Sequence, residues 1–128
     1  MWALLLEIEA VLNNISGLKS INIGTERGIS SKDLPMARVD PVRQEVGDKY
    51  YFTGAIEITF AVDAKNDIRL ADEQLTAFVS AALVQLNTIK TLSNETAWYD
   101  RGEIPNFKTS IITCSFKTKS GLTDDCHT

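Results

Sequence analysis

Apolar residues recur at helical spacing near the start of the chain. They fall at i, i+3, i+4 and i+7, while Glu7, Glu9 and Asn13 lie off the stripe. The stripe consists of Met1, Leu4, Leu5, Ile8, Val11, Leu12 and Ile15. Gly17 suits the position just after a helix, because glycine adopts a positive φ without steric cost. The pattern predicts an amphipathic helix that ends near Ser16 and Gly17.

The next part of the chain alternates between apolar and polar residues, as strands do. Ile21 and Ile23 predict a short strand, and the polar, glycine-containing stretch 24–32 predicts a long loop. A strand is expected over residues 36–46, at a sheet edge or with a bulge, because Pro41 has no N–H to donate. The clearest strand carries its apolar residues at Phe52, Ile56, Ile58, Phe60 and Val62. This alternation predicts a half-buried antiparallel strand.

A second helical stripe follows, and both of its ends suit the helix dipole. Asn66 or Asp67 can cap the N-terminus, and Lys90 falls in the last turn. The apolar face consists of Ala71, Leu75, Phe78, Val79, Ala82, Leu86 and Ile89. These residues predict a helix with one face against the core.

The last part of the chain predicts a short strand at 97–99, a hairpin loop at 100–106 and a long strand at 107–118. One face of the long strand carries Ile112, Cys114 and Phe116. The predicted order is helix, three strands, helix, two strands. It indicates an α+β fold with a mixed, mainly antiparallel sheet and two helices packed on one face. We expect a single domain over 1–118 and a flexible C-terminal tail over 119–128.

Composition describes a globular domain without a basic field. The 128 residues hold 13 Lys+Arg and 17 Asp+Glu, a net charge of −4, so nucleic-acid binding as the main activity is not expected. Hydrophobic residues make up 44% and charged residues 23%, as in soluble proteins. Glu7 and Glu9 interrupt the apolar N-terminal run and no basic residue precedes it, which argues against a signal peptide. No later stretch is apolar enough to predict a membrane span.

Histidine and cysteine are too few to build the common reactive sites. The one His is His127, which makes His-based zinc sites and Ser-His or Cys-His catalysis hard to assemble. Cys114 lies in an alternating apolar run and Cys126 in a polar segment, which indicates a core thiol and an exposed thiol rather than a disulfide. The sequence contains no G-x-G-x-x-G, P-loop, C-x-x-C or H-E-x-x-H motif. We predict no enzyme activity, no cofactor and no metal.

Three polar groupings could carry chemistry but have simpler explanations. Asp63 and Asp67 flank a strand-to-helix turn and could hold a cation, although helix capping explains them. Residues 124–127 have metal-binding side chains in a segment without fixed geometry. Glu57 and Lys117 could pair as acid and base, yet each is the expected solvated residue of a one-sided sheet.

Basic and aromatic residues at loops and strand ends are better candidates for contacts with a partner. Exposed Trp and Tyr are good interface anchors, and the loop 24–32 is longer than a hairpin requires. The Pro41-interrupted strand is a candidate edge. The predicted interface residues are Arg27, Lys32, Arg38, Arg43, Tyr50, Trp98 and Arg101.

The order of these elements resembles a known family. The sequence Asp-Leu-Pro-Met-Ala-Arg-Val at 33–39 leads into an extended segment, and Gly-Ala-Ile-Glu-Ile-Thr-Phe at 54–60 forms a long alternating strand. An amphipathic helix, a Tyr-Asp-Arg sequence and a closing alternating strand follow. Over about residues 3–118, this arrangement resembles the tail terminator proteins of long-tailed bacteriophages.

The resemblance implies a ring, usually a hexamer, on the head-proximal end of the tail tube. Such a ring stops tube polymerisation and offers a surface to the head-completion or connector protein, so its partners are its own copies, the tube protein and that head protein. It implies a virion-tail protein assembled in the host cytoplasm, with DNA passing through the lumen without specific binding. The acidic balance fits this passage, since like charge discourages contact with phosphates.

Other classes remain open at this point. Tail-tube and neck or tail-completion proteins of a similar fold are alternatives. A small dimeric α+β ligand-binding module and an enzyme with carboxylate or tyrosine chemistry are further ones.

Overall fold

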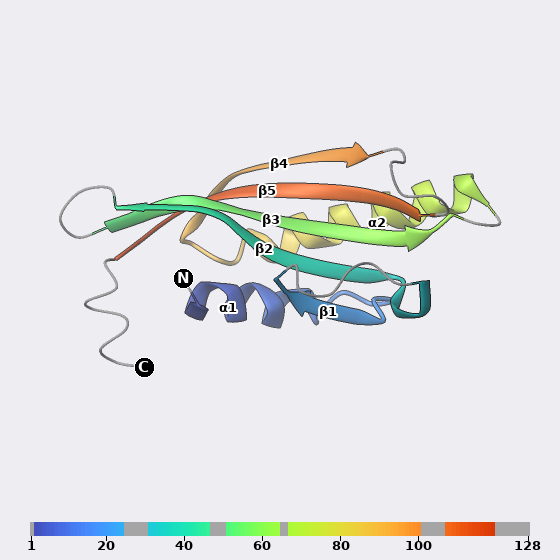
Figure 1. The fold of residues 1–128 in the computed structure, drawn as a ribbon, viewed down its shortest axis with the longest axis horizontal. Coiled ribbons are helices and arrows are strands. Elements are labelled where there is room, and N and C mark those ends of the chain that lie inside the picture. The colour runs from blue at the N-terminus through green and yellow to red at the C-terminus, as the bar shows by residue number, and fades with distance from the viewer. Residues whose placement is uncertain (1, 25–30, 47–50, 65–66, 101–106, 120–128) are drawn as a thin grey trace.

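The computed structural model describes residues 2–24, 31–46, 51–64, 67–100 and 107–119. They form two α-helices and a five-stranded sheet (Figure 1). The elements are α1 (Trp2–Leu12), β1 (Ser20–Ile23), a 3-10 turn η1 (Ser31–Asp33), β2 (Met36–Val46), β3 (Tyr51–Asp63), α2 (Ile68–Leu86), β4 (Leu92–Asp100) and β5 (Phe107–Lys119). The α+β class is therefore confirmed, and the observed order differs in detail from the predicted one by the turn η1.

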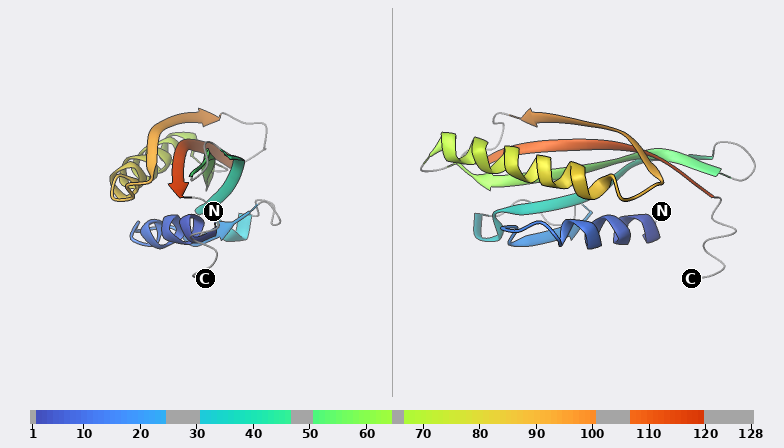
Figure 2. Two further views of the ribbon diagram at one scale, coloured as in Figure 1. Left: turned by 90° about the vertical axis from the view of Figure 1, so that its left-hand side faces the viewer. Right: turned by 180° about the vertical axis from the view of Figure 1, so that it is seen from behind.

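The sheet is mixed and curled (Figure 2). Its strand order is β1-β2-β3-β5-β4, so the last strand in sequence lies between β3 and β4. β1 pairs parallel with β2, and the other three neighbouring pairs are antiparallel. The mainly antiparallel sheet predicted from the sequence is confirmed.

One hydrophobic cluster joins both helices to alternate residues of β2, β3 and β5. The phenyl rings of Phe60 and Phe78 stack within it, with centroids 6.0 Å apart. The fully enclosed strand residues include Val39, Ile56, Ile58, Phe60, Val62, Ile112 and Cys114. A smaller cluster of Leu34, Met36 and Ala61 lies on the other face of the β2–β3 pair, with Phe107 against it. The alternation in the sequence therefore places the core sides of β3 and β5 correctly.

Both helices end one turn before their apolar stripes do. α1 ends at Leu12 rather than near Ser16, because the N–H of Ile15 bonds the carbonyl of Leu12, three residues back, at 3.0 Å. In the same way, α2 ends at Leu86 and the N–H of Ile89 bonds the carbonyl of Leu86 at 3.0 Å. Ile15 and Ile89 are nevertheless buried. The period of the apolar residues follows burial, and burial continues beyond the last α-helical hydrogen bond.

Two strands also differ from their predictions. β4 begins at Leu92, not at residue 97, and its register against β5 shifts between Ser93 and Thr96. β2 contains the bulge that Pro41 predicted, since its register against β3 shifts between Pro41 and Arg43. The prediction of an edge strand is correct for only part of β2, because β1 pairs with residues 36–39 and no further.

Candidate interface surfaces

Four of the seven predicted interface residues cannot be placed as side chains. Arg27, Tyr50 and Arg101 lie outside the described residues. The backbone of Trp98 belongs to β4, opposite Ile111 of β5, and its side chain is outside the described part of the chain. The other three, Lys32, Arg38 and Arg43, are spread along η1 and β2 rather than gathered in one patch.

Lys32 lies in η1, which is tied to the start of β1. The ammonium group of Lys19 donates to the carbonyl of Lys32, and the hydroxyl of Ser20 donates to the carbonyl of Asp33 at 3.0 Å. The backbone of Lys32 therefore holds the turn in place, while its side chain is exposed. This cation is available to a partner.

Arg38 and Asp40 form an ion pair within the chain. Their side chains point to the same face of β2, and Arg38 Nε lies 2.9 Å from Asp40 Oδ2. The two side chains are only 21% and 14% exposed. Asp40 pairs with Glu57 across the β2–β3 ladder, and Asp40 Oδ1 is buried with no hydrogen-bond partner. The Nε of Arg38 is thus engaged inside the protein.

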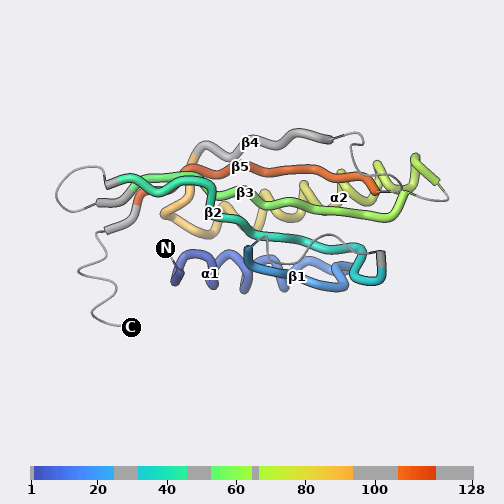
Figure 3. Tube along the Cα trace, in the orientation of Figure 1, coloured from blue at the N-terminus to red at the C-terminus, as the bar shows by residue number. Residues whose placement is uncertain are grey.

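The second half of β2 forms an arm, defined here as residues 41–46 of β2 with residues 51–55 of β3. Every residue from 41 to 45 is exposed, rather than every second one. Neither face of residues 41–45 is therefore covered, and this half of β2 projects beyond the ends of both helices (Figures 1 and 3). Arg43 and Glu45 form a pair at 3.5 Å with both side chains 61% exposed, a geometry that adds little stability.

Gly54 marks the point where the arm meets the rest of the sheet. A Cβ on this residue would lie 1.9 Å from the carbonyl oxygen of Arg43 and 2.8 Å from the ring of Phe116. The bulge brings the two backbones this close, and only glycine leaves room for it. Val42, the extra residue of the bulge, is 54% exposed.

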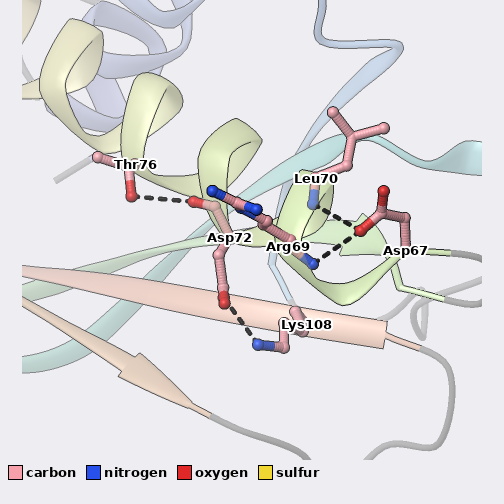
Figure 4. A network of polar contacts seen from close by, with 6 residues as sticks. All are labelled: Asp67, Arg69, Leu70, Asp72, Thr76 and Lys108. Atoms are coloured by element: carbon pink, nitrogen blue, oxygen red, sulfur yellow. Dashed lines mark hydrogen bonds and ion pairs between the residues drawn. The ribbon is translucent and has the colours of Figure 1, made fainter.

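Polar contacts at the start of α2 are structural (Figure 4). Asp67 Oδ1 accepts from the N–H groups of Arg69 and Leu70 at 3.0 and 3.1 Å, which confirms Asp67 as the N-cap. Lys108 Nζ of β5 contacts Asp72 Oδ1 at 2.7 Å and ties the helix to the sheet. A shallow surface hollow of about 430 Å³ lies beside these residues. It is lined by Arg69, Asp72, Glu73, Thr76 and Ala77.

The structure gives little support to the two pairs of charged residues that could carry chemistry, Asp63 with Asp67 and Glu57 with Lys117. The carboxylate of Asp67 is occupied by capping, and the described residues contain no group of three His, Cys, Asp or Glu side chains that could hold a metal ion. Glu57 pairs with Thr113 and Lys117 with Thr53, so the two charged residues are not opposite one another.

Comparisons with known proteins identify a similar fold but no family. No family profile and no curated protein matches the chain. A solved structure, whose name states no function, superposes with a TM-score of 0.57 at 10% sequence identity, covering 93% of this chain and 92% of that one. At this identity the likeness concerns the fold alone. Among the described residues, no helix is long and apolar enough to cross a membrane.

Proposed function

We propose that the chain is a structural protein of the phage tail terminator type. It forms a homo-oligomeric ring, a hexamer, on the head-proximal end of a tail tube, stops further tube growth and presents a surface to the head-completion protein. The observation that supports this best is the arm. Five consecutive exposed residues in a long strand contribute nothing to the core of their own subunit. A contact with a neighbouring subunit gives them a role.

Within each subunit of the proposed ring, both helices pack on one face of the sheet. The proposed function depends on binding and shape rather than on catalysis. The net charge of −4 suits a lumen through which DNA passes without binding. A structure of the assembled ring tests the expected charge of the lumen, because a basic lumen would contradict this part of the proposal.

Sedimentation velocity and negative-stain microscopy of the full chain test the proposal. We expect an equilibrium between monomers and closed rings, with rings bound at one end of added tail tubes. Filaments without end would identify a tube protein instead. A stable dimer or a monomer that never binds tubes would contradict the ring.

Charge reversal in the loop 24–32 tests whether that loop takes part. Replacing Arg27 and Lys32 together by Glu should weaken ring formation and leave the melting temperature of the monomer nearly unchanged, because the Lys32 side chain is exposed. Lys90→Glu, an exposed change after α2, is the matched control. An unchanged sedimentation profile of the double variant would remove the loop from the interface.

A further inference from the structure

The sheet ends in two different open edges. β1 covers β2 only along residues 36–39, so within the described chain no strand lies beside the outer side of β2 from Asp40 onward. At the other end of the sheet, β4 pairs with β5 and with no other described strand. Both edges therefore present backbone N–H and C=O groups that a further strand can bind.

The directions of the strands make these two edges complementary. β2 is antiparallel to β3, β3 to β5, and β5 to β4, so β2 and β4 run in opposite directions. Rotation about an axis along the strands leaves their directions unchanged. A neighbouring copy generated by that rotation would set its β2 antiparallel to β4 of the first copy, which is the stronger kind of pairing.

Bulges limit the length of each open edge. Along the open part of β2, the longest run in regular register with β3 is Arg43 to Val46, and in β4 the longest run in regular register with β5 is Thr96 to Asp100. Pro41 and the two bulges disfavour pairing elsewhere along these edges. A short regular stretch therefore remains at each edge, and this restricts the register in which two copies can meet.

We propose that residues 43–46 of β2 pair antiparallel with residues 96–100 of β4 in a second copy of the chain. The inference rests on the proposed ring and names the contact that builds it. Because the two edges differ, the contact is heterologous: it does not stop at a dimer, and successive copies form a ring when the rotation between them closes. A contact this short is weak in isolation and is strengthened when the copies are held together on a tube.

Chemical cross-linking of the full chain tests the contact. In a Cys126→Ser background, in which the buried Cys114 is the remaining thiol, Gln44→Cys and Thr96→Cys are combined and treated with a short bismaleimide. We expect a series of cross-linked oligomers from dimer to ring size. Each single variant should stay uncross-linked. Gln44→Cys with Glu73→Cys, an exposed position on α2, is the matched control and should give no series. Circular dichroism and the melting temperature check that every variant folds.

The possible failures are distinct. Dimers from Gln44→Cys alone would show a two-fold β2–β2 contact and overturn the inference. Rings in the microscope without cross-linking would overturn the named contact and leave the proposed function standing. A chain that sediments as a monomer and gives no cross-links with or without tubes would overturn both.

Discussion

The two halves of β2 have opposite environments within one strand. Residues 36–39 lie between β1 and β3, and Met36, Ala37 and Val39 are at most 1% exposed. After the bulge, residues 41–45 are all exposed. The difference shows that burial in a strand is set by its neighbours. The first half of β2 has a strand on each side and a helix layer, whereas within the described chain the second half pairs with β3 alone.

The same comparison applies to stability. The covered half gains from the apolar area it removes from water, whereas the arm depends on backbone hydrogen bonds that largely replace bonds to water. We therefore expect substitutions in the covered half to change folding and substitutions in the arm to change assembly.

The largest loss is expected from Phe60→Ala in β3, opposite Ala37 of the covered half. Phe60 is fully buried and stacks on Phe78, so its truncation leaves a cavity and should lower the free energy of unfolding by about 3–5 kcal/mol. Urea denaturation measures the change. Phe60→Leu, which refills most of the volume, should lose much less. A loss below about 1 kcal/mol for the alanine variant would mean that this region is not the core.

Gly54→Ala acts at the junction between the two halves. The added methyl would collide with the Arg43 carbonyl and the Phe116 ring, so we expect a loss of about 1–3 kcal/mol. Thr53→Ala, next to it in β3, is the control and should have a small effect. A neutral Gly54→Ala would show that the bulge relaxes without cost, and amide hydrogen exchange in residues 42–46 would then locate the relaxation.

A smaller effect on stability is expected at the start of α2, outside the arm. Asp67→Ala removes the acceptor for two backbone N–H groups and should cost about 1 kcal/mol. Asp67→Asn keeps a capping oxygen and should retain most of the stability. Thermal unfolding compares the two, and equal losses would argue against capping as the cause.

The smallest effect on stability is expected in the arm. Val42→Ala and Arg43→Ala should each change the free energy of unfolding by less than about 0.5 kcal/mol, because both side chains are exposed and the Arg43–Glu45 pair is open to solvent. Urea denaturation measures both changes in the free energy of unfolding. A loss comparable with that of Phe60→Ala would remove the contrast between the two halves.

The sequence predicts those parts of the fold whose burial has a simple period. The alternation of Ile56, Ile58 and Phe60 places β3 and its core side. The position before an apolar stripe indicates Asn66 or Asp67 as the cap, and the structure shows Asp67 in that role. The start of β4 is missed because Ser93 and Asn94 read as a turn, and pairing with β5 overrides that preference. The helix ends are misplaced because Ile15 and Ile89 stay buried beyond the α-helical hydrogen bonds.

The sequence predicts only part of the arm. Pro41 predicted the bulge, and Arg43 was among the candidate interface residues. Exposure at Val42 and Gln44 was missed, because it depends on β1 ending its pairing at Val39, which no local pattern reports. The crowding around Gly54 likewise depends on Phe116 of β5, a strand that is far from β2 and β3 in sequence.

The position of β5 has a consequence for biosynthesis. β5 is translated after β3 and β4, yet it lies between them in the sheet. A nascent chain that has completed β3, α2 and β4 still lacks the strand that joins them, so the sheet cannot close until residues 107–119 have left the ribosome. Translation that stops before β5 would leave the apolar residues of β3 without their neighbouring strand and expose them to aggregation.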